Sequence, residues 1–152
     1  MQTQKSLSLR PVATTFPRSV LEPYGYAVLA IGGADGDLAK SERDLFIAEG
    51  RSRGVPEETL AAWARFDWQG ADLPALLNEL RPQLTEASAR HLLFDAIRVA
   101  RADGDYSLEE RYAVDTAARA LAVDPNIVRA LTGLAEMEEA LVRLRAGLLD
   151  VG

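Results

Sequence analysis

Apolar residues recur along this chain at the spacing of helices that bury one face. The clearest case is the stretch 86–102, in which apolar side chains at 92, 93, 96, 97 and 100 fall on one side of a helix. For the short apolar run "YAVLAIGGA", periodicity alone leaves a buried strand open as an alternative. The pattern as a whole predicts an all-α fold, with helices over 21–33, 41–54, 56–66, 73–84, 86–102, 107–122, 125–135 and 136–149.

A chain of 152 residues suits one domain. Residues 1–20 mix Ser, Thr, Gln and two prolines without helical periodicity, which predicts a flexible N-terminal tail. Residues 21–150 are then expected to form a single domain, a compact bundle of seven or eight helices.

One acidic phrase is written twice. "ADGDLAKSER" occupies residues 34–43 and "ADGDYSLEER" occupies 102–111, an offset of 68 that the apolar residues on both sides share. The repeated unit is a helix, an acidic turn, a helix and a further helix, at about 26–63 and again at about 94–131. This regularity predicts an internal duplication whose two tandem units pack with approximate twofold symmetry around one core.

The charge balance excludes several classes of partner. A net charge of −6 disfavours binding to nucleic-acid backbones and to anionic lipid, because both need clustered Lys and Arg. The sequence has neither a signal peptide at its start nor an apolar run long enough for membrane insertion, so a cytoplasmic location is expected. With no cysteine and a single histidine, His91, a zinc site of the usual kind is also excluded. His91 itself is expected at the surface or at the boundary of the core.

Both acidic phrases carry the oxygen ligands that calcium, magnesium and manganese prefer. Aligned with an EF-hand loop, Asp35 and Glu42 take positions 5 and 12, but positions 1 and 3 fall on side chains that cannot ligate a hard cation. One phrase supplies about four oxygens where calcium takes six to eight, so a strong site needs both phrases. The candidate metal ligands are Asp35, Asp37, Glu42, Asp103, Asp105 and Glu110.

The same residues also suit plain helix boundaries. Gly36 and Gly104 can supply a left-handed turn, and Ser107 with Glu110 has the spacing of a capping box. The first phrase has Ala39 in place of that serine, which breaks the box there and favours a second role for its glutamate. Helix punctuation and the binding of a cation or partner both remain open at this point.

With its two A-D-G phrases, each followed by a Glu at a helix start, the sequence resembles the TerB-like tellurite-resistance family. The resemblance spans about 21–149 and is carried by "AIGGADGDLAKSERDLF" and "AIRVARADGDYSLEERYAV", of which the first departs from the pattern because Gly32-Gly33 interrupts its helix. It implies a compact bundle of about seven helices that serves stress and tellurite-resistance systems as a cytoplasmic or membrane-associated scaffold, not as an enzyme. It also implies a divalent-cation site at Asp35, Glu42, Asp103 and Glu110.

The expected function is therefore that of a non-enzymatic binding or scaffold module with a protein partner, in which self-association is also open. Two alternatives are a metal-dependent enzyme centred on the same carboxylates and a plain helical oligomerisation module. The aromatic residues Trp63, Phe66 and Trp68 are expected in the core, and an exposed Trp68 would instead mark a partner site. The leucines at 141, 144 and 148 are expected to pack against the rest of the domain.

Overall fold

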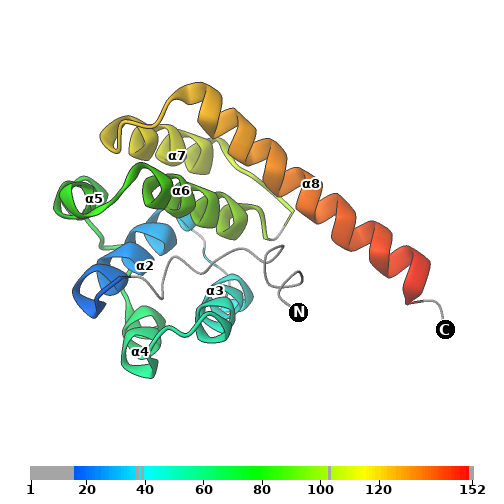
Figure 1. Ribbon diagram of the computed structural model, residues 1–152, viewed down its shortest axis with the longest axis horizontal. Helices are drawn as coiled ribbons and strands as arrows, with labels where there is room; N and C mark the ends of the chain where they lie inside the picture. The colour runs from blue at the N-terminus through cyan, green and yellow to red at the C-terminus, as the bar shows by residue number, and fades with distance from the viewer. Residues whose placement is uncertain (1–15, 37, 39, 103, 151–152) are drawn as a thin grey trace, which may run out of the picture.

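The computed structural model describes residues 16–36, 38, 40–102 and 104–150. These residues form seven α-helices and one short 3-10 helix, η2, with no strand among them (Figure 1). The all-α prediction is confirmed. The elements are α2 (Arg18–Gly32), α3 (Lys40–Ser52), α4 (Glu57–Arg65), α5 (Leu73–Leu80), η2 (Arg81–Gln83), α6 (Glu86–Arg101), α7 (Leu108–Ala120) and α8 (Pro125–Leu149).

Three helices differ from the sequence prediction by three residues or more. Where one helix was expected over 73–84, α5 ends at Leu80 and η2 follows it. Helix α2 begins at Arg18, so three residues assigned to the tail are helical, and residues 1–15 lie outside the described part of the chain. The helices expected at 125–135 and 136–149 form one continuous helix, α8. A glycine at 133 lies inside α8 with open space around it, which weakens a helix without ending it.

Helices α2 and α6 form the centre of the domain. They pack against each other more extensively than any other pair among the described helices, and α8 then packs on the outer side of α6. The apolar run "YAVLAIGGA" belongs to α2, so the strand alternative is wrong. The predicted buried face of α6 is confirmed, with its five members Leu92, Leu93, Ala96, Ile97 and Ala100 all fully buried.

Trp63 anchors the half of the core beneath α2. Its ring stacks on Phe46 at 4.8 Å between centroids, and its Nε1 donates a hydrogen bond to the carbonyl of Leu21 at 3.2 Å. Gly25 makes this approach possible, because a Cβ at that position would lie 2.0 Å from the indole ring. The prediction of a core role is confirmed for Trp63, while Phe66 and Trp68 are half-buried and pack against the same core.

The C-terminal part of α8 extends beyond the rest of the domain (Figure 1). The leucines at 141, 144 and 148, which were expected to pack against the domain, are 58–65% exposed, so that prediction is wrong. There are two reasons. The three leucines lie on another side of α8 than Val128 and Ala135, which pack on the domain, and α8 has 25 residues, whereas α6, on which it packs, has 16.

Candidate functional site

The two acidic turns have the same backbone geometry. Gly36 and Gly104 both have a φ of 87°, the left-handed conformation that glycine adopts without strain. Each glycine donates its backbone N–H at 2.9 Å to the carbonyl three residues earlier, to Gly33 in the first turn and to Arg101 in the second. The predicted left-handed turns are therefore present in both phrases.

The match continues beyond the turns. Helices α3 and α7 have the same length and begin and end 68 residues apart, as do the starts of α4 and α8. After α3 and α7 the chain again turns left-handed, at Gly54 with φ 90° and at Ala122 with φ 58°. In each case the next residue, a valine, donates its backbone N–H to a carbonyl five residues back, at 3.0 and 2.8 Å. These features are consistent with an internal duplication.

The C-terminal ends of α2 and α6 meet, which places both turns at the same end of this helix pair. At Gly32 a Cβ would lie 2.5 Å from Val99 Cγ1 and 3.7 Å from the backbone nitrogen of Ala100. A Cβ on Gly33 would lie 2.5 Å from the ring of Trp68. The sequence suggested that these two glycines interrupt the helix, but they do not interrupt α2. Gly32 is its last residue, and both allow close packing beside the first turn.

A buried glutamate lies in the first turn of each helix that follows an acidic turn. Glu42 in α3 and Glu110 in α7 are 4% and 3% exposed. Glu110 accepts a hydrogen bond from the Ser107 backbone at 3.0 Å, and Ser107 Oγ accepts one from the Glu110 backbone at 3.1 Å, which is the predicted capping box. A carboxylate at a helix N-terminus is also stabilised by the helix dipole.

The other candidate ligands lie differently. Asp35 and Asp105 are exposed, while Asp37 and Asp103 lie outside the described residues, as does Ala39. Within the described ranges, no three His, Cys, Asp or Glu side chains come close enough together to hold a metal ion. The described part of the site thus consists of two buried glutamates and two exposed aspartates on paired turns.

Arg101, the last residue of α6, forms ion pairs with α8. Its guanidinium binds Glu139 of α8 through two contacts of 2.9 Å and lies 3.6 Å from Glu136. One turn earlier on α6, Arg98 binds Glu49 of α3 through both of its terminal nitrogens and lies 3.7 Å from Glu138. These ion pairs connect α3, α6 and α8 beside a groove of about 400 Å³.

The sequence analysis missed a buried polar pair between α2 and α6, formed by Tyr24 and Asp95. The Tyr24 hydroxyl donates a hydrogen bond of 2.8 Å to Asp95, whose other carboxylate oxygen lies 3.8 Å from Arg53. The pKa of Asp95 is raised above its ordinary value, because burial has the largest effect. The hydrogen bond from Tyr24 and the charges of Arg53, Arg98 and His91 lower the pKa and offset part of this rise. Burial, together with the nearby carboxylate, raises the pKa of Tyr24 well above its ordinary value. The only signal in the sequence is an Asp on the apolar face of the helix that becomes α6.

Fold and site together define a class: an all-helical domain that carries a helix–acidic turn–helix unit twice, with both turns at one end of its central helix pair. The family described as tellurite resistance protein TerB matches residues 27–132, which is more than half of the chain. The chain belongs to the TerB family.

A solved structure has the same fold. A tellurite resistance protein from Nostoc punctiforme superimposes with a TM-score of 0.71 at 26% sequence identity. The similarity covers 88% of this chain and 82% of that one. A comparison with curated proteins finds no match. No helix of the described residues combines the length and the apolar character that crossing a membrane requires.

Proposed function

We propose that this chain is a non-catalytic binding module of a tellurite-resistance or stress-response system, and that its paired acidic turns bind a divalent cation. Calcium, magnesium and manganese are the candidates, because the ligands are carboxylate and carbonyl oxygens. One observation carries the proposal. The same turn is built twice, with the same φ of 87° and a buried glutamate after it, and both copies lie at one end of the α2–α6 pair.

The ligand count explains why two turns are needed. Calcium takes about six to eight oxygen ligands, and one phrase offers about four. With a single turn, water molecules would have to supply the remaining ligands. Glu110 also accepts the Ser107 backbone N–H, so this carboxylate serves the helix cap as well. A cation held between the turns would tie the α2–α3 connection to the α6–α7 connection and would stabilise the folded state by its binding energy.

Thermal unfolding with and without millimolar calcium, magnesium or manganese tests this function. At a hundred times its dissociation constant, a cation adds about 2.7 kcal/mol to the free energy of unfolding. In a domain of this size the melting temperature then rises by about 5–10 °C. We expect that rise in the wild type and its loss in the Asp35→Asn/Asp103→Asn double variant.

A matched control is available in the same part of the molecule. Glu109 and Asp115 of α7 are exposed. Glu109→Gln/Asp115→Asn removes the same number of negative charges as the test variant and leaves the proposed ligands unchanged. This control should keep the full rise in melting temperature. If both double variants lose the rise equally, the rise in melting temperature depends on the net charge of the protein and not on the proposed ligands. If none of the three cations raises the melting temperature, the acidic phrases serve only as helix boundaries.

The enzyme alternative has less support. The five cavities characterised among the described residues have other linings, and none includes Asp35, Glu42, Asp105 or Glu110. A binding module needs only an accessible surface, whereas a carboxylate-centred enzyme needs a pocket in which substrate and carboxylates meet. We therefore propose the binding role for these residues.

A further inference from the structure

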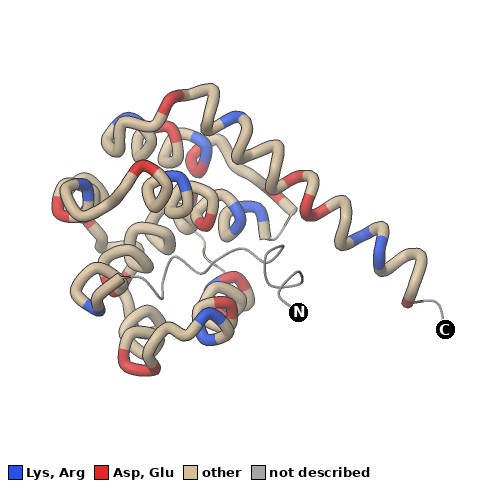
Figure 2. The backbone as a smooth tube through the Cα atoms, in the orientation of Figure 1, with Lys and Arg blue, Asp and Glu red and all other residues tan. Residues whose placement is uncertain are grey.

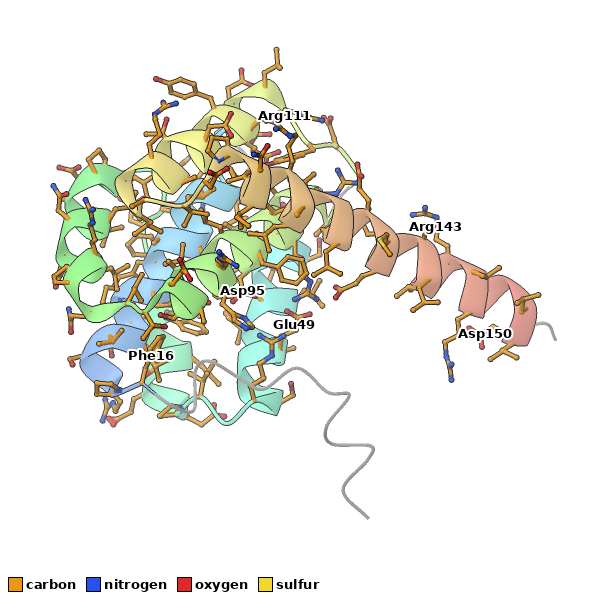
Figure 3. The ribbon with its side chains drawn as sticks, turned by 45° about the horizontal axis from the view of Figure 1, so that its top comes forward. Phe16, Glu49, Asp95, Arg111, Arg143 and Asp150 are labelled. Atoms are coloured by element: carbon orange, nitrogen blue, oxygen red, sulfur yellow. The ribbon has the colours of Figure 1, made fainter. Side chains whose placement is uncertain are left out.

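Helix α8 leaves the domain and carries an uncovered apolar surface with it. Its first half packs on α6 and α7, with Val128 and Ala135 buried. Residues 140 to 150 are all exposed. They form the end of α8 that extends away from the other helices (Figure 1 and Figure 3). A helix that is surrounded by water is usually polar on all sides, but this part of α8 is largely apolar.

The exposed apolar residues form a heptad stripe. Leu134, Met137, Leu141, Leu144 and Leu148 follow one another at steps of three, four, three and four residues, and they are 41%, 68%, 65%, 58% and 65% exposed. This mean spacing of 3.5 residues is that of the a and d positions of a coiled coil, and it keeps the stripe facing a partner helix. Because the side of α8 that packs on the domain is a different one, the stripe is open to a second helix along its whole length.

The charges beside the stripe select the partner and its direction. Glu138 and Arg145 lie on one edge at the same heptad position with opposite charge, and Ala140 and Gly147 lie on the other edge. Figure 2 shows acidic residues followed by basic residues along the protruding part of α8. In a parallel pair this charged edge would face only the small residues of the other helix. In an antiparallel pair with Leu141 opposite the partner's Leu144, each Glu138 meets the partner's Arg145. The complement of this helix is thus a second copy of itself, running the other way.

The register uses four of the five residues of the stripe. With Leu141 opposite the partner's Leu144, Met137 lies opposite the partner's Leu148, so the pair has four apolar layers related by a twofold axis. At its N-terminal end the stripe runs into a groove of about 310 Å³ lined in part by Phe94, Leu131 and Leu134. That groove continues the apolar surface toward the end of the partner helix. Arg98, which lies 3.7 Å from Glu138, already binds Glu49 through two contacts and leaves Glu138 able to pair outward.

We propose that two copies of this chain associate through α8 as an antiparallel helix pair, in the register that places Leu141 against the partner's Leu144. This inference goes beyond the cation-binding role and does not depend on it. A cation response is read from melting temperature, and the association is read from molar mass.

Light scattering and sedimentation across about 1–100 μM, a range that spans common dimer affinities, test the association on the full chain. The wild type should approach twice its 16.5 kDa mass as the concentration rises. Leu141→Ser/Leu144→Ser should weaken the dimer at least tenfold, with an unchanged circular dichroism spectrum because both residues are exposed. The matched control is Val142→Ser/Leu149→Ser, which removes two aliphatic side chains of similar exposure from another face of α8 and should leave the dimer intact.

Crosslinking tests the direction, since the natural chain contains no cysteine. A mixture of a Met137→Cys chain and a Leu148→Cys chain should form a disulfide between unlike chains, and each variant alone should crosslink poorly. Arg145→Glu should weaken the dimer, and Arg145→Glu combined with Glu138→Arg should restore it. A wild type that stays monomeric at all concentrations would overturn the proposal, as would efficient crosslinking of Met137→Cys with itself, which indicates a parallel pair.

Discussion

The buried hydrogen bond between Tyr24 and Asp95 should contribute measurably to stability. Asp95 is 6% exposed, and its other neighbour, Arg53, lies 3.8 Å away, so the Tyr24 hydroxyl is its short hydrogen-bond donor. Tyr24→Phe keeps the ring and its packing but leaves the carboxylate without that donor. We expect a loss of about 1.5–3 kcal/mol in the free energy of unfolding at pH 7, the range for hydrogen bonds to charged groups.

Urea denaturation followed by circular dichroism measures this loss, and thermal melting should show a decrease of about 3–12 °C. Tyr112 provides the matched control, because its side chain is 70% exposed. Tyr112→Phe should change the free energy of unfolding by less than about 0.5 kcal/mol. The reasoning is refuted if Tyr24→Phe is as neutral as Tyr112→Phe at pH 7.

The pH dependence has a defined sign. Burial raises the pKa of Asp95, so between its ordinary value and the raised one the folded state holds more protons than the unfolded state. Stability therefore falls as pH rises through that window. Since the hydrogen bond from Tyr24 lowers this pKa, Tyr24→Phe should extend the falling region to higher pH. Asp95→Asn should remove this contribution in both backgrounds, and denaturation at several pH values between 4 and 8 shows whether it does.

Four further substitutions test the close packing and the turns. Gly32→Ala should cost about 1–3 kcal/mol, because its Cβ would lie 2.5 Å from a Val99 methyl group, whereas Gly133→Ala, in open space, should be neutral or stabilise α8 by up to about 1 kcal/mol. Similar values for both in urea denaturation would contradict the close approach of α2 and α6. Ala122→Gly should stabilise by up to about 1 kcal/mol, because alanine there has a φ of 58°; a clear loss of stability would argue against that strain. Ser107→Ala should cost about 0.5–2 kcal/mol through the lost cap, and an unchanged urea midpoint would show that the box contributes nothing.

Much of the local structure could be predicted from the sequence. The capping box of Ser107 and Glu110 forms as predicted, because a cap involves only residues three positions apart. Asp72 and Thr85 cap α5 and α6 through the same local spacing. The left-handed turns at Gly36 and Gly104 follow in the same way from the freedom of a residue without a Cβ. The division of α8 was wrong, because a single glycine weakens a helix without stopping it when no capping residue or proline follows.

Prediction of the candidate site reached the phrases but not their surroundings. The sequence identified the glutamates of both turns, and nothing in it showed that Glu42 and Glu110 would be buried. It also treated Gly32 as an interruption, because its role depends on Val99 across the helix pair.

The sequence by itself thus determined the helices, their caps and the register of the two acidic turns, since these depend on periodicity and on interactions a few residues apart. Only the tertiary structure decided that Asp95 meets Tyr24, 71 residues away, and that both turns lie at one end of the central helices. It also decided the fate of the leucines on α8. A heptad stripe shows that a helix has an apolar face, but whether that face is covered depends on which side of the helix packs on its neighbours and on how far those neighbours extend.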